Sequence, residues 1–276
     1  MKKLKSVLFL SIVMALSLLV AGCQQGGLTS SSNSSSSASV EPLQSSSKSS
    51  NESLATSTNS VSNNSSEVSS SGVNSSENLP SSNGLVYTLL EDNTYEVSAF
   101  DNSNSMVFIP DDVDGIKVTS IGFHAFEGCN SLTSVEIPDS VTIICDGAFF
   151  DCDELISVTI GDNVVNIING AFYDCDGLTS ITIPDSVESI GSLAFYGCDN
   201  LTTVEIGCSV EDIGNLAFHG CDNLTSVVFE NTSGWWRTLS SAATSGTSIE
   251  QDKLADASTA ATYLINAYSI YHWRRS

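Results

Sequence analysis

The sequence predicts a repeat solenoid, a stack of short units that share one continuous core. The pair Ala-Phe occurs five times in steps of 23 residues, at 125–126, 148–149, 171–172, 194–195 and 217–218. One cysteine, one leucine and several β-branched residues recur in each unit with the same step. A unit of this size cannot bury its apolar face alone, so its copies must stack on one another.

The first 22 residues are predicted to be a lipoprotein signal peptide. Three lysines within the first five residues precede an apolar run over 7–20, and small residues follow at 21–22. The run is shorter than the roughly 20 apolar residues that a membrane-spanning helix needs. Its ending, Val-Ala-Gly-Cys, resembles a bacterial lipobox, which implies cleavage before Cys23 and lipid attachment to Cys23. An ordinary secretory signal with a chance cysteine is the alternative.

Residues 23–83 are predicted to be a disordered tether. They are mostly Ser and Asn with almost no aromatic side chains, so they cannot bury enough apolar surface to fold. A flexible coil of that length has a root-mean-square span on the order of 40 Å. It would hold a folded domain away from the membrane.

Residues 118–229 hold five units of the pattern V-x-x-I-G-x-x-A-F-x-x-C-x-x-L-x-x-V-x-I. Glu136 lies between the apolar Val135 and Ile137, and this alternation predicts a strand with one buried face. The V-x-x-I-G segment predicts a second short strand, whose glycine (Gly122 in the first unit) can take a tight backbone angle. Ala, Cys and Leu recur at i, i+4 and i+7, which predicts a short helical turn. The predicted fold is thus a stack of parallel β-strands and short helical turns with a 23-residue period.

This pattern resembles a known class of repeats. Residues 118–140 (VTSIGFHAFEGCNSLTSVEIPDS) and 181–206 (ITIPDSVESIGSLAFYGCDNLTTVEI) look like the BspA-like bacterial leucine-rich repeats. The resemblance covers 118–229 and implies a right-handed leucine-rich-repeat stack. It also implies a function in adhesion or protein binding at the cell surface.

Two caps are expected at the ends of the stack. Residues 84–117 resemble the N-terminal segment of the same class: a β-hairpin with an Asp-Asn turn and a degenerate repeat, in which Val107 and Ile109 correspond to Val135 and Ile137. Residues 230–276 are predicted to be an aromatic cap, because a terminal repeat would otherwise expose its core. Its aromatic and basic residues are Trp235, Trp236, Tyr263, Tyr268, Tyr271 and Trp273, with Arg237, Arg274 and Arg275. One helix face is expected from the spacing of Tyr263, Leu264, Ala267, Tyr268 and Tyr271.

The cysteines of the repeats are predicted to be a buried structural ladder, because free cysteine behaves as a small hydrophobe. The ladder positions are Cys129, Cys152, Cys175, Cys198 and Cys221. Disulfides between adjacent units are the alternative, whereas no unit has the paired thiols typical of a metal site. Cys145 and Cys208 lie off the ladder in different units, so they are not expected to pair, and the sequence leaves their redox state open.

The aspartates beside the ladder are predicted to shape turns, since Asp side chains bond to nearby backbone groups. They directly follow the cysteines, at Asp153, Asp176, Asp199 and Asp222. A row of carboxylates could instead gather calcium, but no loop has the alternating ligand order of a calcium loop.

No catalytic site, metal site or cofactor is predicted. The sequence lacks the motifs of nucleotide-binding, zinc-protease and serine-hydrolase sites. His124 and His219 occupy variable repeat positions that are expected to be exposed. A carboxylate pair of the glycosidase type stays open among so many acids. The net charge is −23, with no Lys or Arg over 118–229, so nucleic acid is not an expected partner.

The candidate binding face consists of the outward positions of the predicted strands, which flank each buried valine or isoleucine. These ten residues are Ser134, Glu136, Ser157, Thr159, Ser180, Thr182, Thr203, Glu205, Ser226 and Val228. Repeat proteins use such extended faces for binding. Recognition by the caps, with the face serving only as scaffold, is the alternative.

The expected protein is held by its N-terminal lipid on the extracytoplasmic face of the cell membrane. Its expected partner is a protein or glycan on a host or neighbouring cell. A structural role in the envelope, without an external ligand, is the second hypothesis.

Overall fold

The computed structural model describes residues 78–80 and 83–276. The predicted signal peptide, the lipid-attachment residue Cys23 and almost all of the tether lie outside the described residues. The described residues belong to one compact unit, Ser75–Ser276.

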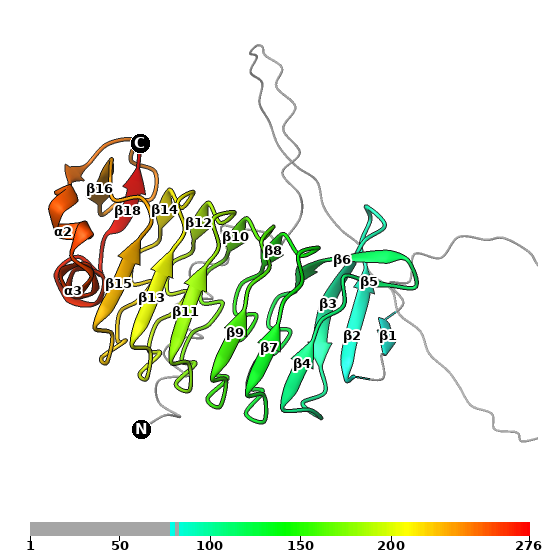
Figure 1. Ribbon diagram of the computed structural model, residues 1–276. Helices are drawn as coiled ribbons and strands as arrows, with labels where there is room; N and C mark the ends of the chain where they lie inside the picture. The colour runs from blue at the N-terminus through cyan, green and yellow to red at the C-terminus, as the bar shows by residue number, and fades with distance from the viewer. Residues whose placement is uncertain (1–77, 81–82) are drawn as a thin grey trace, which may run out of the picture. The chain divides into compact units, whose positions relative to one another are not determined.

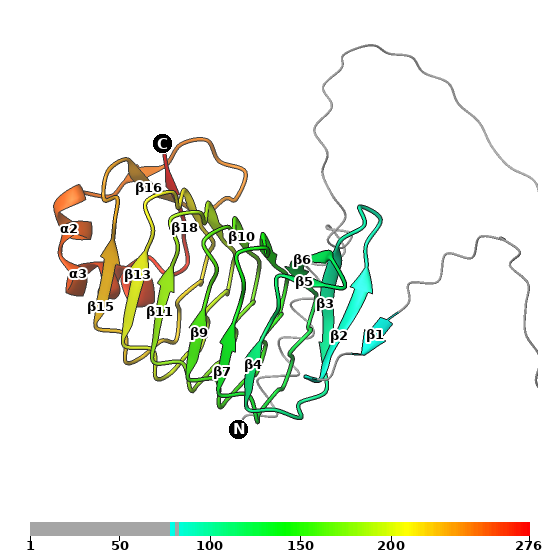
Figure 2. The ribbon, with the colours of Figure 1, turned by 45° about the vertical axis from the view of Figure 1, so that its right-hand side comes forward.

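Each repeat contributes two short strands, one to each side of a shared core (Figure 1). The strands of the predicted binding face, here called the front strands, form two three-stranded parallel sheets, β4-β7-β9 and β11-β13-β15. The front strands are β4 (Met106–Phe108), β7 (Ser134–Glu136), β9 (Ser157–Thr159), β11 (Ser180–Ile183), β13 (Thr203–Ile206) and β15 (Ser226–Phe229). Figure 2 shows them side by side along the stack.

The second strand of each repeat belongs to a long sheet on the other side of the core. Its repeat strands, here called the back strands, are β6 (Ile116–Ile121), β8 (Ile143–Ile144), β10 (Asn166–Ile167), β12 (Ser189–Ile190) and β14 (Asp212–Ile213). Parallel pairing puts Ile167 opposite Ile144 and Ile190 opposite Ile167, one 23-residue step at a time. The predicted solenoid of parallel strands with this period is confirmed.

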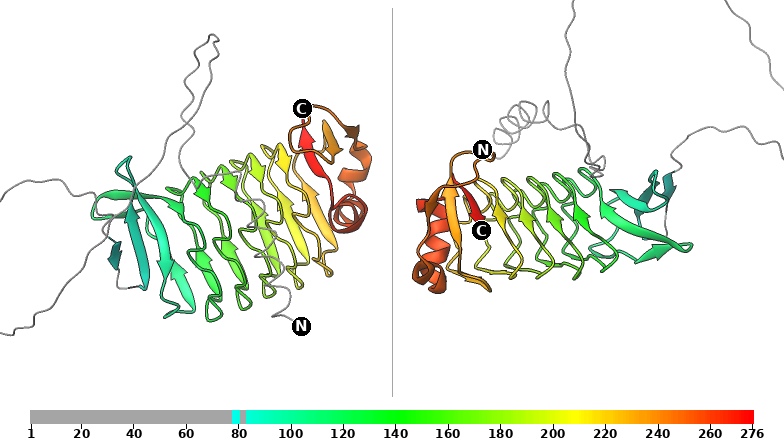
Figure 3. Two further views of the ribbon diagram at one scale, coloured as in Figure 1. Left: turned by 180° about the vertical axis from the view of Figure 1, so that it is seen from behind. Right: turned by 90° about the horizontal axis from the view of Figure 1, so that it is seen from above.

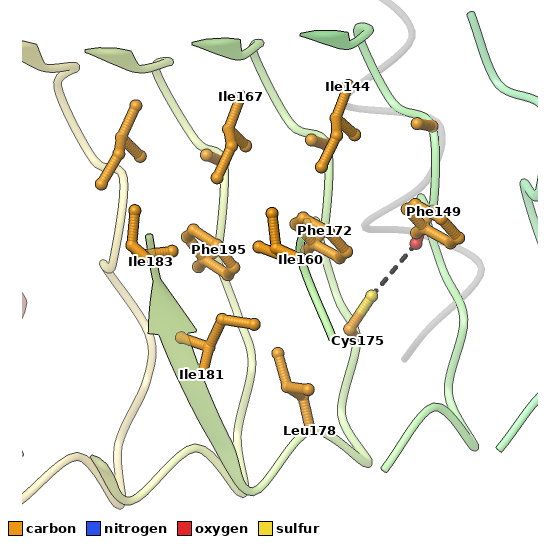
Figure 4. Close-up of a cluster of buried hydrophobic side chains, with 14 of the residues drawn as sticks. Ile144, Phe149, Ile160, Ile167, Phe172, Cys175, Leu178, Ile181, Ile183 and Phe195 are labelled. Atoms are coloured by element: carbon orange, nitrogen blue, oxygen red, sulfur yellow. Dashed lines mark hydrogen bonds between the residues drawn. The ribbon is translucent and has the colours of Figure 1, made fainter. Parts of the chain in front are cut away.

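The aromatic core is a ladder of phenylalanine rings. Phe149, Phe172 and Phe195 are fully buried, and the ring centroids of successive pairs lie 5.1 Å apart with nearly parallel planes. Figure 4 shows these rings in a row, with isoleucines of the back strands on one side and Leu178 on the other. Each ring is therefore packed by the units before and after it, which couples the units energetically.

The segment between the back and front strands is a series of tight turns and not a helix. The N–H of Cys129 bonds to the carbonyl of Phe126 at 3.2 Å, and the N–H of Leu132 bonds to that of Cys129 at 3.0 Å. The residue before each ladder cysteine has a positive φ, for example 52° at Asp174 and 66° at Gly128. A left-handed residue at this position ends any helix. The predicted helical periodicity of Ala, Cys and Leu is thus met by turns.

A glycine follows the back strand in three of the five units, and Gly191 is needed there because no space is left for a side chain. Gly122 and Gly191 are absent from the positive-φ positions of the described residues, which differs from the tight backbone angle expected for Gly122. A Cβ on Gly191 would lie 2.6 Å from the backbone N of Asn169 in the preceding unit. Close stacking therefore excludes a side chain at Gly191, whereas Cys145 and Ile168 occupy the equivalent position in two other units.

The N-terminal end of the stack is covered by a hairpin of β2 (Leu85–Leu89) and β3 (Tyr95–Phe100), with Asn93 at φ 63° in its turn. β3 then pairs in parallel with β6, and β5 (Asp112–Val113) pairs with the start of β6. β1 (Asn78–Pro80) pairs antiparallel with β2, although these three residues fall within the predicted tether. β1 thus covers the outer edge of β2, and a strand at the end of a sheet tolerates a proline such as Pro80.

The C-terminal end is covered by β16 (Trp235–Thr238), β17 (Thr247–Ser248), α2 (Gln251–Ala255), α3 (Ala257–Thr262), the π-helical turn η2 (Tyr263–Ala267) and β18 (His272–Arg275). β18 pairs antiparallel with β14, the last back strand, and with β16. The helices lie beside β15, the last front strand (Figure 3). The predicted helix face ends early, because the helical segment stops at Ala267 and Tyr271 lies beyond it. The chain must leave the helix there for β18 to reach β14.

Candidate binding surface

The ten predicted face residues lie on the solvent side of the front strands. Eight of them are exposed, and the other two, Ser134 and Ser226, are half-buried. Strand pairing aligns them in rows, with Ser180 opposite Thr203 and Thr203 opposite Ser226. The second row joins Thr182, Glu205 and Val228 in the same way. The face is therefore a regular array whose spacing is set by the sheets.

Hydroxyl groups on this face bond across neighbouring strands. The Ser157 hydroxyl donates to the Ser134 hydroxyl at 3.1 Å, and the Thr182 hydroxyl donates to a carboxylate oxygen of Glu205 at 3.1 Å. Each bond fixes a side-chain rotamer at the surface. The acceptor positions that remain can take hydrogen bonds from a ligand.

The structure adds two residues that the sequence analysis did not include in the face. Met106 and Phe108 project from β4, the strand of the degenerate repeat, and are 73% and 58% exposed. Pairing places Met106 opposite Ser134 and Phe108 opposite Glu136. The signal was present in the sequence, because the assignment of Val107 and Ile109 to the core makes their neighbours point outward.

The aspartates that follow the front strands, such as Asp139 and Asp185, link each unit to the next by hydrogen bonds. A carboxylate oxygen of Asp139 accepts from the N–H of Asp162 at 2.8 Å, and one of Asp185 accepts from the N–H of Cys208 at 2.7 Å. This backbone hydrogen bond holds the pKa of Asp185 below its usual value. These carboxylates thus have a structural role in stacking.

The aspartates beside the ladder cysteines are joined to the next unit through their backbone. The Asn200 side chain donates to the carbonyl of Asp176 at 2.8 Å, and that of Asn223 donates to the carbonyl of Asp199 at 2.7 Å. Over the part of the chain that the structure describes, no three Asp, Glu, His or Cys side chains are grouped as metal ligands would be.

The ladder cysteines are buried and hydrogen-bonded. Each thiol from the second unit onward donates to the carbonyl of the phenylalanine one unit earlier, as Cys175 does to Phe149 at 3.1 Å (Figure 4). The equivalent distances are 2.9 Å for Cys152, 3.2 Å for Cys198 and 3.1 Å for Cys221. Burial raises the pKa of the Cys129 thiol to about 12 and moves those of Cys175 and Cys198 in the same direction. The thiols of Cys129, Cys175 and Cys198 are therefore poor nucleophiles.

Replacing Cys175 by alanine is expected to lower the free energy of unfolding by about 1 kcal/mol or more, for the lost buried sulfur and its hydrogen bond. Urea denaturation of the full chain measures this change. Cys208→Ala is the matched control, because Cys208 is exposed and should tolerate the change. A fully stable Cys175→Ala variant that lost a function would contradict the structural role of this thiol.

The seven cysteines of the described residues are thiols, and Cys145 is buried whereas Cys208 is exposed. The difference follows from position. Cys145 directly follows the back strand β8 and is buried, while Cys208 takes the exposed turn position that holds aspartate in earlier units.

A second aromatic column lies along the turns. The rings of Phe150 and Tyr173 are 4.9 Å apart, and those of Tyr173 and Tyr196 are 4.8 Å apart, both nearly parallel. His124 approaches Phe150 at 6.0 Å, and His219 approaches Tyr196 at 5.5 Å. Both histidines are half-buried, so the expectation that they are exposed is wrong. Their position at the ends of a stacked column explains the burial.

The basic residues of the C-terminal cap hold it against the last repeat. Arg274 forms an ion pair with Asp212 at 2.8 Å, and the Arg275 Nε donates to the carbonyl of Val210 at 3.0 Å. The Arg237 guanidinium lies over the rings of Tyr268 and Tyr271, at 3.9 and 4.6 Å from their centroids. Burial raises the pKa of Asp212, and Arg274 opposes that shift. These basic side chains therefore make contacts that stabilise the cap.

Within residues 78–80 and 83–276, no helix has the length and apolar character needed to cross a membrane.

Comparisons with known proteins agree with this architecture. The family described as BspA type leucine rich repeat region matches residues 119–245 in six copies. A leucine-rich repeat protein of T. pallidum with a crystal structure is 32% identical, with a TM-score of 0.52 over 55% of this chain and 71% of that one.

Two further solved structures are similar. A leucine-rich repeat protein from Bacteroides capillosus is 28% identical, with a TM-score of 0.41 over 55% of this chain and 97% of that one. One from Bacteroides ovatus is 32% identical, with a TM-score of 0.42 over 52% of this chain and 45% of that one. The search of curated proteins gave no match. Three findings agree: the 23-residue repeat, the match to this family and the 32% identity to the T. pallidum protein. The chain therefore belongs to the BspA-type leucine-rich repeat proteins.

Proposed function

We propose that this chain is a lipid-anchored, non-catalytic binding protein of the bacterial cell surface, and that its front strands contact a protein or glycan on a host or neighbouring cell. The observation that carries the proposal is the array of outward side chains on two parallel sheets. Most of these side chains are exposed, and strand pairing fixes their spacing. Solenoids of this kind present extended surfaces for binding.

The acidic character of the chain restricts the classes of molecule that it can bind. No Lys or Arg occurs over 118–229, and the net charge is −23. Nucleic acids and anionic membrane surfaces are therefore repelled. Neutral glycans and proteins with basic surfaces are the compatible classes.

The proposed anchor is a lipid on Cys23, supported by the sequence Val-Ala-Gly-Cys after the apolar run. Replacing Cys23 by alanine is expected to move the protein from the membrane fraction to the soluble or secreted fraction, because a cysteine thiol is the attachment point. Fractionation of producing cells, with metabolic labelling by a fatty-acid analogue, measures both location and modification. Retention of label and membrane association by Cys23→Ala would contradict the anchor.

Binding is tested with whole cells that produce the full chain, exposed to panels of matrix proteins, mucins and glycans. Saturable binding is expected, and it should weaken when Glu136 and Glu205 are changed to Gln. Glu188→Gln and Glu230→Gln form the matched control, since both residues are exposed, lie off the ten-residue face and lose the same charge.

No saturable binding, together with an envelope defect on loss of the gene, would contradict the proposal. That outcome would favour the second function, a structural role in the envelope. Turnover of a polysaccharide or peptide by the purified chain would contradict the non-catalytic assignment.

A further inference from the structure

We infer that the N-terminal part of the front face is the centre of recognition, and that it binds a cationic polypeptide segment carrying an apolar side chain. The surface in question is here called the Met106–Phe108 patch and comprises Met106, Phe108 and Glu136. The inference rests on the proposed function and specifies its partner class.

The patch is unusual for its exposed apolar side chains. Among the described residues, eight large hydrophobic side chains are exposed, and two of them lie on the three-residue strand β4. Met106 is 73% exposed and Phe108 58%. Exposed apolar groups gathered within polar surroundings mark interaction sites. Elsewhere on the front strands the outward residues are Ser, Thr and Glu, with Val228 as the exception.

The backbone that carries the apolar pair is fixed by hydrogen bonds. Met106 and Phe108 are two residues apart on β4, so both point to the same side of the strand. β4 is paired with β7 along its length, and the carbonyl of Phe108 also accepts from the Asn83 side chain at 3.4 Å. An anchor presented by an ordered strand needs little further ordering when a partner binds.

The surroundings of the pair are negative. Glu136 lies opposite Phe108 in the sheet register and is exposed. Asp111 and Asp139 follow the same two strands and are also exposed. A cation placed over the ring of Phe108 would be attracted by the ring and by the Glu136 carboxylate together. Lys117, a basic residue near in sequence, lies opposite Asp112 on a separate ladder.

This combination favours a polypeptide over the other candidate ligands. A Lys- or Arg-bearing segment with one apolar residue would match both the negative surroundings and the apolar pair. A neutral glycan would use the hydroxyl rows and gain little from Met106. A second copy of this chain would be repelled, since each copy has a net charge of −23.

The test uses cells that produce the full chain and a fluorescent extended peptide in which Lys alternates with Thr around a central Phe. Saturable binding above that of cells lacking the chain is expected. The variant Met106→Ser/Phe108→Ser should bind at least about tenfold more weakly, as expected for a hot spot. Glu136→Gln should bind about threefold more weakly and show less dependence on salt.

Matched variants separate the patch from the general negative charge. Leu239→Ser removes an equally exposed apolar side chain from the cap, and Glu188→Gln removes one exposed charge away from the front face. Both are expected to bind the peptide like the unchanged chain. A peptide with Ser in place of its Phe should lose the dependence on Met106 and Phe108. Circular dichroism of the purified variants checks that each is folded.

Equal weakening by Glu136→Gln and Glu188→Gln, or unchanged binding by Met106→Ser/Phe108→Ser, would overturn the inference. Binding of a neutral polysaccharide, with fluorescent dextran as the probe, that depends on Met106 and Phe108 would also overturn it. The proposed function would survive either result if a panel ligand still bound through Thr182 or Glu205. It would fail separately if no panel ligand bound at all.

Discussion

Replacing Phe172 by alanine is expected to lower the free energy of unfolding by about 3–5 kcal/mol, the range for removing a buried aromatic side chain. Phe172 is fully buried and stacks on Phe149 and Phe195, at 5.1 Å on each side. The cavity would lie in the middle of the ladder, where neither neighbour can fill it without leaving its own stack. Part of the loss is the ring–ring attraction on both sides.

Urea denaturation of the full chain, followed by circular dichroism, measures the loss as a lower midpoint. Phe123→Ala is the matched control, because the same atoms are removed from a side chain that is 64% exposed. It should change the stability by less than about 0.5 kcal/mol. Equal effects of the two substitutions would show that the ladder does not carry the stability assigned to it.

Replacing Trp273 by alanine is expected to destabilise the chain by a similar amount, about 3–5 kcal/mol, and to promote aggregation. Trp273 is 1% exposed and lies on β18, which pairs with the last back strand. Its ring stacks parallel to Phe229 at 6.2 Å and meets Trp235 edge-on at 6.4 Å. Without it, the apolar end of the last repeat and the edge of the long sheet would be uncovered.

Thermal unfolding with light scattering measures both consequences. Trp236→Ala is the control, since Trp236 lies on the adjacent strand and is only half-buried. Its expected cost is about 1 kcal/mol, without aggregation. A Trp273→Ala variant that stayed soluble and lost no stability would contradict the capping role of this segment.

The repeat positions could be predicted because each is seen five times. A pattern such as Phe172, Cys175 and Leu178 is ambiguous in one unit and clear when compared with its sister units. The same comparison gave the strand alternation around Val135, and both strands of each unit are present. The period and the stacking thus follow from sequence and general physics.

The turn geometry could not be predicted in the same way. The i, i+4, i+7 spacing of Ala, Cys and Leu fits a helix as well as a series of tight turns. The deciding feature is a left-handed residue before each cysteine, which is Asp in two units and Gly in the other three. Asp174 at φ 52° shows that a non-glycine residue adopts this angle. The presence of glycine therefore does not identify the left-handed position in every unit.

The second aromatic column was missed for a related reason. Phe150, Tyr173 and Tyr196 occupy one repeat position, but the first and last units hold Glu127 and His219 there. A repeat position that holds an acid, an aromatic residue or a histidine in different units is typical of a variable surface position. Only the stacking of units shows that the middle rings contact one another.

The candidate face was predicted in its regular part and missed at its degenerate end. Met106 and Phe108 belong to a repeat that has no cysteine and whose Ala99-Phe100 pair falls outside the 23-residue step, so its strand was assigned to the cap rather than to the face. The pairing of β4 with β7 places both side chains on the same surface as Ser134 and Glu136. The most apolar part of the surface is thus where the repeat pattern is weakest.

The most direct test of recognition by the front face is photo-crosslinking on cells that produce the full chain. The Lys/Thr peptide would carry a benzophenone side chain in place of its central Phe, and mass spectrometry would locate the attachment sites. The predicted result is attachment within β4, β7 and β9, centred on Met106, and its loss when unlabelled peptide competes. Attachment concentrated in the C-terminal cap, or spread evenly over the acidic turns, would contradict recognition by this face.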